Sequence, residues 1–199
     1  MITSSPKKKN IFILVGQEDC ADTFCSALAS AYEQGARQAG HDIRRINIGD
    51  LKFDPLLHKG YRVIQELEPD LKKVQEDIRW ANHIVIIYPT WWSAMPAILK
   101  GFFDRIWLPG FAFHFHKNGL GWDELLKGRS GRVITTMDEW PLAERILFGD
   151  STNEISRAIL KFSGIKPIRV SKIGPLKDAS DSQKRGWLNW ATEIGKRAR

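Results

Sequence analysis

The residues best suited to chemistry lie at positions 89–96, which read PTWWSAMP. Two prolines enclose the adjacent Trp91 and Trp92 directly after an apolar run, where a turn facing solvent is normally polar. Flat aromatic side chains can pack against a planar conjugated ligand, while backbone groups of the same loop bind its polar edge. Each tryptophan could equally cover the core or a subunit interface, so taken singly the two interpretations stay open.

Two further segments carry polar groups. Positions 16–24, GQEDCADTF, contain neither the G-x-G-x-x-G fingerprint nor a P-loop, which argues against nucleotide binding in those styles. A helix that begins near Thr23 and Cys25 would instead offer free N–H groups that can hold a phosphate without a lysine. The alternative is that Asp22 or Thr23 is a simple N-cap. Positions 135–138, Thr-Thr-Met-Asp, end another apolar run and could add hydroxyl and N–H groups to the same ligand.

An alternation of strands and helices must position these segments. Short apolar runs predict five strands, at residues 11–15, 43–48, 84–88, 133–137 and 168–173. Between them, apolar residues recur every three or four positions and predict helices. Such βαβ alternation predicts an α/β fold with an open, doubly wound parallel sheet. Ligands bind there beyond the carboxyl ends of the strands, so positions 16–23, 89–96 and 137–151 should lie side by side.

Length and composition limit the function classes. The 199 residues suffice for one well-buried core, so we expect a single domain over residues 1–199, with residues 1–9 as a flexible basic tail. No apolar run approaches the ~20 residues of a membrane helix, and the polar opening lacks the apolar centre of a signal peptide. We therefore expect a cytoplasmic protein. Cys20 and Cys25 match neither a zinc spacing nor a disulfide framework, so both thiols should be reduced.

The net charge of +7 raises the question of a polyanionic partner. Much of the excess lies near the two ends of the chain, in the lysines at positions 7–9 and in Lys196, Arg197 and Arg199. A solvated tail is the usual explanation for such clusters. Because no recognition motif accompanies the charge, we do not expect nucleic-acid binding.

His114 and His116 alternate with phenylalanines, and on a strand both imidazoles would lie on one face, a spacing that can support a metal. No Cys or carboxylate completes the set nearby in the sequence. We therefore expect no metal site.

Over nearly its whole length the chain resembles the flavodoxin-like NAD(P)H:quinone oxidoreductase family, which includes modulator-of-drug-activity and potassium-efflux ancillary flavoproteins. The most specific part is residues 88–113, YPTWWSAMPAILKGFFDRIWLPGFAF, which is similar to the family's aromatic loop, PAxLKGxxDRV motif and Gly-Phe-Ala-aromatic tail. The resemblance implies a flavodoxin-like three-layer sandwich with a five-stranded parallel sheet of order 2-1-3-4-5. It also implies a homodimer, bound FMN or FAD, and ping-pong hydride transfer from NADH or NADPH to a quinone-like acceptor.

The resemblance also implies site residues. Those for the flavin phosphate are Thr23, Phe24 and Cys25, with Gln17 as the nearest match to the histidine usual in the first loop. Those for the isoalloxazine ring are Pro89, Thr90, Trp91, Trp92 and Ser93. A second loop at the ring edge comprises Thr135, Thr136, Met137 and Asp138, although the family commonly has two glycines in place of the last two. Candidates for the acceptor pocket are Phe111, Phe113 and Trp140.

No catalytic acid or base follows from the resemblance. Phe148 stands near the place of the histidine that assists hydride transfer in family members, and Trp140 only loosely matches the assisting tyrosine. A different class of function within the same resemblance is a regulatory flavodoxin-fold subunit, as in potassium-efflux systems, that works by binding a membrane partner.

Overall fold

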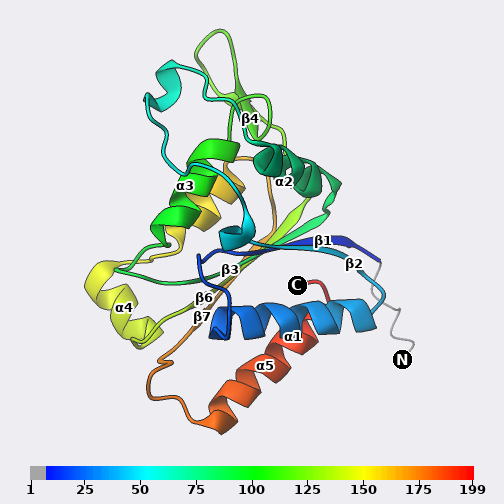
Figure 1. Cartoon of the computed structure of the whole chain (residues 1–199), viewed down its shortest axis with the longest axis vertical. Coiled ribbons are helices and arrows are strands. Elements are labelled where there is room, and N and C mark those ends of the chain that lie inside the picture. The colour runs from blue at the N-terminus through cyan, green and yellow to red at the C-terminus, as the bar shows by residue number, and fades with distance from the viewer. Residues whose placement is uncertain (1–7) are drawn as a thin grey trace.

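The computed structural model describes residues 8–199 and contains the five predicted parallel strands. They are β1 (Asn10–Val15), β2 (Asp42–Asn47), β3 (His83–Pro89), β6 (Ser130–Thr136) and β7 (Ile168–Ile173). Their order is β2-β1-β3-β6-β7, which is 2-1-3-4-5 when only the strands of this sheet are counted. The predicted flavodoxin-like sheet is therefore confirmed (Figure 1).

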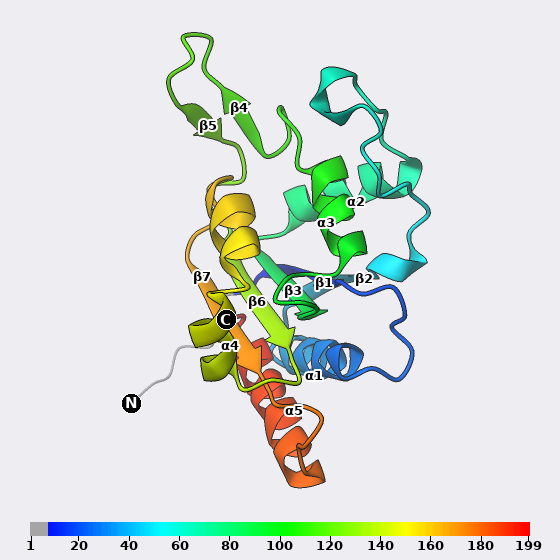
Figure 2. The ribbon, with the colours of Figure 1, turned by 90° about the vertical axis from the view of Figure 1, so that its left-hand side faces the viewer.

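Helices cover both faces of the sheet and make three layers. One face carries α1 (Phe24–Gln38) and α5 (Asp181–Lys196); the other carries α2 (Pro69–Trp80) and α3 (Ala97–Ile106), as Figure 2 shows. Alternate residues of β1 supply the two cores. Phe12 and Leu14 pack with α2 and α3, whereas Ile11, Ile13 and Val15 pack with α1 and α5. A strand buried on both faces needs an unbroken apolar run, which explains the residue pattern of β1.

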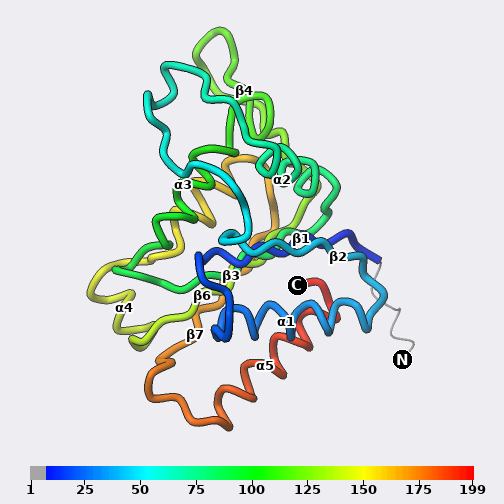
Figure 3. Tube along the Cα trace, in the orientation of Figure 1, coloured from blue at the N-terminus to red at the C-terminus, as the bar shows by residue number. Residues whose placement is uncertain are grey.

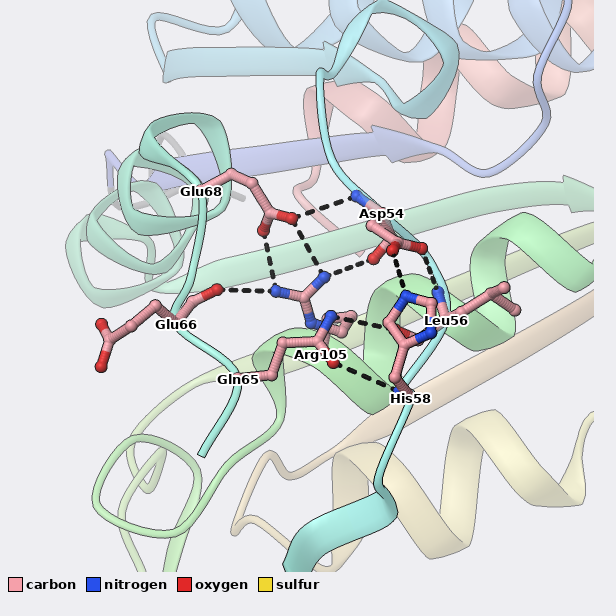
Figure 4. A network of polar contacts seen from close by, with 7 residues as sticks. All are labelled: Asp54, Leu56, His58, Gln65, Glu66, Glu68 and Arg105. Atoms are coloured by element: carbon pink, nitrogen blue, oxygen red, sulfur yellow. Dashed lines mark hydrogen bonds and ion pairs between the residues drawn. The ribbon is translucent and has the colours of Figure 1, made fainter. Parts of the chain in front are cut away.

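The long segment between β2 and α2 is tied to α3 by one buried arginine. Arg105, 1% exposed, donates to the backbone oxygens of Asp54 and Glu66 and to both carboxylate oxygens of Glu68 (Figure 4). The Glu66 oxygen accepts at 2.8 Å and Glu68 Oε2 at 2.9 Å. Partial burial raises the pKa of Glu68, but hydrogen bonds from Arg105 and from backbone N–H groups outweigh this, and the pKa is lowered. The arginine thus fixes the backbone of this segment to α3, in addition to the apolar contacts that Leu51, Phe53 and Leu67 make with the core.

Two glycines allow α1 and α5 to touch, and the Cα trace in Figure 3 shows the helices side by side. A Cβ atom on Gly35 of α1 would lie 1.9 Å from the Thr192 oxygen, and one on Gly195 of α5 would lie 2.2 Å from the Tyr32 oxygen. Both obstacles are backbone atoms, which cannot move aside as a side chain can.

Gly35→Ala should therefore lower the free energy of unfolding by about 1–3 kcal/mol, the usual cost of overpacking. Gly186→Ala is the matched control, since it lies in α5 with no atom within 4 Å of its would-be Cβ. That change should stabilise the protein by about 0.5–1 kcal/mol through better helix propensity. Urea denaturation measures both, and a shift of the same sign in the two variants would contradict the close-packing argument.

Two features are absent from the sequence prediction. A short hairpin joins β4 (Phe113–Phe115) to β5 (Trp122–Glu124), and α4 (Pro141–Phe148) lies within the segment predicted as loop. The helix expected between the last two strands is present, and it is a π-helix (Glu154–Lys161). Only Glu144 of α4 is buried, so α4 has no apolar stripe facing the core that periodicity could detect. The hairpin strands, at three residues each, are too short for alternation to stand out.

The predicted basic tail at residues 1–9 falls for the most part on residues 1–7, which lie outside the described residues. Lys8 forms an ion pair with Asp42 at 2.9 Å, and Lys9 donates to the Ala198 oxygen at 3.1 Å. Across residues 8–199, none of the helices is both long and apolar enough to cross a bilayer.

Candidate functional site

The loops after β1, β3 and β6 meet at one edge of the sheet. Thr90 N–H donates to the Thr136 oxygen at 2.7 Å, and the hydroxyl oxygens of Thr90 and Thr135 lie 2.6 Å apart. Cys25 Sγ lies 3.3 Å from Thr136 Oγ1, which joins the start of α1 to the same cluster. Burial raises the pKa of the Cys25 thiol to about 12, so this cysteine packs as a neutral thiol and is no nucleophile.

The loop at residues 89–96 makes a tight turn with an exposed aromatic side chain at its tip. Trp91 and Ala94 exchange backbone hydrogen bonds of 2.9 and 3.0 Å, and between them Trp92 and Ser93 have φ of 51° and 54°. Positive φ at both central residues is the mark of a type I′ turn, which ordinarily requires Asn or Gly. The indole of Trp92 is fully exposed. A strained backbone that presents a bare tryptophan at a sheet edge fits a ligand-binding role.

The start of α1 supports both interpretations of Thr23. Its Oγ1 accepts from Ser26 N–H at 3.2 Å, so Thr23 is the N-cap. In the described part of the chain the N–H groups of Phe24 and Cys25 have no acceptor, which leaves two donors for an anion. A hollow of about 560 Å³ lies beside this turn, and Lys184 of α5 is one of its lining residues. Gln17 is buried and donates to the Asp19 backbone oxygen of its own loop.

Met137 and Asp138 do not reproduce the conformation that two glycines would allow. Neither has a positive φ. Met137 is buried, its N–H donates to the Ile173 oxygen at 2.9 Å, and its own oxygen accepts from Leu176 N–H at 3.0 Å. This segment therefore continues the pairing with β7, and Met137 offers no free backbone group to a ligand.

A cavity of about 370 Å³ opens between the second and third loops and α4. Predicted residues Thr90, Trp92, Ser93 and Met137 line it, together with three residues that were not predicted to bind, Glu139, Glu144 and Phe148. Met137, Trp92 and Phe148 give it apolar walls. The arrangement suits a flat ring of modest size.

An ion-pair cluster backs this cavity. Glu144 is 3% exposed; its Oε2 lies 2.9 Å from Lys172 Nζ, which lies 3.0 Å from Asp150 Oδ1. Within the described residues, Glu144 Oε1 and the hydroxyls of Tyr88 and Ser151 are buried without a hydrogen-bond partner. Burial raises the pKa of Tyr88, so its hydroxyl keeps its proton. Of these groups, only Glu144 lines the cavity itself, and the others lie behind it.

Asp150→Asn should destabilise the protein in a pH-dependent way. Burial raises the pKa of Asp150, but hydrogen bonds from Thr152 and Lys172 outweigh it and bring the pKa to about 2. A lowered folded-state pKa stabilises above the unfolded value near 3.9, and the contribution is lost as the pH falls toward 2. Because the side chain is partly exposed, we expect about 1 kcal/mol or less at pH 7.

Urea denaturation of wild type and Asp150→Asn between pH 2 and 7 measures the difference in the free energy of unfolding between them. This difference should vanish near pH 2. Asp178→Asn, at an exposed position, is the control and should show no such pH dependence. If the difference in the free energy of unfolding stays constant with pH, the charge of Asp150 is not its cause.

The three residues expected in the acceptor pocket lie in different surroundings. Phe111 is 5% exposed and packs against Trp107 and under Arg79. Phe113 lines a separate aromatic groove of about 520 Å³ next to α3, with Tyr61, Trp107 and Phe162 among its other residues. Trp140 is 67% exposed and precedes α4. In a single copy of the chain these side chains do not share one cavity with Trp92.

The hairpin brings a carboxylate to one of the two histidines. His116 Nε2 lies 3.2 Å from Asp123 Oδ1, and this hydrogen bond raises the pKa of His116. The sequence interpretation, which found no carboxylate nearby, missed this contact because Asp123 arrives from the second strand of the hairpin. Among the described residues, no group of three or more His, Cys, Asp or Glu side chains could hold a metal ion.

Lys184, Glu144 and Lys172 were not predicted as site residues. The sequence contains one signal that could have indicated Glu144. It is an acidic residue in a segment that is otherwise rich in large apolar side chains, Pro141–Phe148. Lys172 lies on β7 and Lys184 on α5, so only the sheet order and the packing of α5 bring them to this edge.

Comparisons with known proteins agree with this geometry. A family model described as "Flavodoxin-like fold" matches residues 9–190. A relative from Haemophilus influenzae named "Uncharacterized NAD(P)H oxidoreductase" is 23% identical over 188 residues, which cover 92% of this chain and 93% of the relative.

Solved structures share the fold. An NAD(P)H:quinone oxidoreductase from Methanothermobacter marburgensis superposes with a TM-score of 0.81 at 21% identity, covering 96% of this chain and all of that one. An FMN-dependent NADH-azoreductase from Bacillus anthracis, solved in complex with FMN, gives a TM-score of 0.70 at 19% identity, covering 94% of this chain and 98% of that one.

Proposed function

The chain belongs to the flavodoxin-like fold family, and from this premise we propose that it is a flavoprotein that passes hydride from NADH or NADPH, through bound FMN or FAD, to a quinone-like acceptor. The observation that carries the proposal is the turn at Trp92 and Ser93, whose strained backbone holds an exposed indole over a cavity at the carboxyl ends of the strands. The printed names of relatives and fold neighbours, NAD(P)H oxidoreductase and quinone oxidoreductase, support the same reaction class.

The residues at this edge fit a flavin. The free N–H groups of Phe24 and Cys25 would bind its phosphate, with Lys184 adding charge beside the same hollow. Trp92 would lie against the ring, and Thr90, whose hydroxyl is held by the buried Thr135 hydroxyl, would bind its polar edge. When bound, a flavin supplies two-electron hydride chemistry, while the protein supplies orientation and electrostatics. The resemblance also assigned Gln17, Pro89, Trp91, Ser93, Thr136, Met137 and Asp138 to the flavin, and these stay predictions.

Both substrates would bind in turn against the open face of the bound ring, in a ping-pong order. Reduction of a quinone to a hydroquinone consumes a proton as well as a hydride. We assign the supply of that proton to the Lys172 ammonium, which would pass it through the Glu144 carboxylate, 2.9 Å away on the cavity wall, and regain one from solvent. Glu144→Gln should then slow acceptor reduction about 10²-fold while FMN retention changes little. Stopped-flow rates and equilibrium dialysis separate the two quantities, and an unchanged rate would exclude the pair as proton donor.

We also propose that the chain works as a homodimer. Helix α4 buries its glutamate and exposes Leu142, Ile146, Leu147 and Phe148, the reverse of a helix that faces a core. Contiguous apolar exposure of this kind marks an interaction surface. A second copy could cover α4 and also bring the aromatic residues near Phe113 toward the cavity. Sedimentation velocity tests this, and a monomer at micromolar concentration would contradict it.

The decisive experiment is optical. The protein purified from cells should be yellow, and anaerobic addition of NADPH or NADH should bleach the visible flavin band, which should return when a quinone is added. A colourless protein that neither takes up FMN or FAD nor oxidises NAD(P)H would overturn the proposed reaction. It would favour the regulatory-subunit alternative, for which the exposed apolar face of α4 would be the docking surface. A cytoplasmic location stays a prediction.

A further inference from the structure

A basic groove of about 550 Å³ lies at the amino ends of the strands, opposite the candidate active site. Seven lysine and arginine residues line it, which are Lys8, Lys9, Arg129, Lys166, Arg169, Arg197 and Arg199. No Asp or Glu side chain is among its described lining residues. An α-carboxylate at Arg199 would neutralise only one of these seven positive charges.

The groove is assembled from distant parts of the chain. Figure 1 shows the start of β1 and the end of α5 on the side of the molecule away from α4. Lys9 Nζ donates to the Ala198 oxygen at 3.1 Å, and Arg132 Nε donates to the Arg199 oxygen at 2.8 Å. His41 links the same two ends, since its ring nitrogens lie 3.2 Å from Lys9 N and 3.2 Å from the Lys196 oxygen. The described parts of the two basic ends therefore lie next to each other, and their exposed side chains contribute to one surface.

The charges in the groove are poorly compensated. Lys166 pairs with Glu124 and Lys8 with Asp42, both at 2.9 Å, but within residues 8–199 no carboxylate side chain forms an ion pair with the other five basic residues of the groove, Lys9, Arg129, Arg169, Arg197 and Arg199. Burial lowers the pKa of Lys9, and Arg169 and Arg199 lower it further by repulsion. Like charges held this close raise the free energy of the folded state unless an anion binds between them.

A buried histidine behind the groove shows the same field. His83 is 1% exposed, and within the described residues its Nε2 atom is buried without a partner. Burial lowers its pKa to about 3, and Lys9, Arg132 and Arg169 add to the effect. Burial, the largest cause, would penalise a charge of either sign, and only the repulsion from Lys9, Arg132 and Arg169 reflects the positive charge near the groove.

We propose that this groove is a second ligand site, which binds a small polyanion with closely spaced phosphate groups. Planar guanidinium groups bind phosphate oxygens in pairs, and Arg169, Arg197 and Arg199 supply three of them in one hollow. A concave site of this size suits several linked phosphates better than a straight duplex, which needs an extended surface. The phosphate groups could belong to a free compound or to lipid headgroups. The site lies at the amino ends of the strands, whereas Trp92 follows the carboxyl end of β3, so the site does not depend on the proposed reaction.

The test is calorimetric titration of the full chain with inorganic tripolyphosphate at low salt. Arg169→Gln combined with Arg197→Gln should weaken binding at least about tenfold, because two bidentate contacts are lost. Lys59→Gln combined with Arg62→Gln is the matched control; it removes the same charge from exposed positions outside the groove and should leave binding unchanged. Equal loss in both double variants, or orthophosphate binding as tightly as tripolyphosphate, would overturn the proposal. Urea midpoints check that both variants are folded.

A second arm identifies the source of the phosphate. Retention of the protein by phosphatidylglycerol vesicles at physiological salt, lost in the Arg169/Arg197 variant, would identify lipid headgroups. Tripolyphosphate binding without vesicle retention would identify a free compound. A 20-base-pair duplex that binds through the same arginines, and that tripolyphosphate cannot displace, would overturn the proposal in favour of a nucleic-acid surface.

Discussion

Arg105→Met should lower the free energy of unfolding by about 3–5 kcal/mol, because it removes one partner of a buried ionic network and leaves the other charge uncompensated. The guanidinium serves Glu68 and the backbone oxygens of Asp54 and Glu66, and methionine can replace only its aliphatic volume. Glu68 is partly exposed and can recover some hydration, which places the expected value toward the lower limit.

Urea denaturation measures the loss. Arg37→Met is the matched control, since Arg37 forms an exposed i,i+4 pair with Glu33 and should change stability by no more than about 0.5 kcal/mol. Arg105→Lys keeps the charge but cannot reach all three acceptors with a planar fork, so an intermediate loss is expected. If Arg105→Met and Arg37→Met cost the same, the network would not be what holds residues 51–68 against α3.

Trp92→Gly should change stability and ligand affinity in opposite directions. Glycine relieves the positive φ of 51°, so the protein without ligand should gain about 1 kcal/mol. Loss of the indole should weaken FMN binding by about 5- to 150-fold, since one aromatic stacking contact is worth about 1–3 kcal/mol. Equilibrium dialysis with FMN and urea denaturation of the same preparation measure the two effects.

Ser93→Gly distinguishes the effect of the indole ring on FMN binding from the effect of the strained turn. It relieves φ of 54° in the same turn and removes no aromatic surface, so it should stabilise the protein and keep FMN affinity within about threefold. Equal loss of FMN affinity in both variants would show that the strained turn, and not the tryptophan ring, is what binds. If Trp92→Gly bound FMN as tightly as wild type, Trp92 would have no part in the flavin site.

Local pattern was enough for most of the fold. The five strands were predicted because parallel strands buried on both faces need apolar runs, and β1 shows such a run from Ile11 to Val15. Their order was expected from the family resemblance, and the structure confirms it. Thr23 as N-cap could be predicted because capping depends only on neighbours in the chain. Helix α4 could not, since its single buried residue is Glu144 and its apolar side chains face outward.

The sequence by itself therefore determined the strands, the alternation that makes a doubly wound sheet and the three loops that meet beyond it, since these follow from periodicity and from the handedness of crossovers. The order of the strands followed from the family resemblance. Only the tertiary structure decided which charged groups meet. The contacts of Glu144 with Lys172, of Arg105 with Glu68, and of Lys9 with the end of α5 join residues between 28 and 189 positions apart. Such pairs follow no characteristic spacing in the sequence, because each depends on how whole elements pack and on which side chains that packing removes from water.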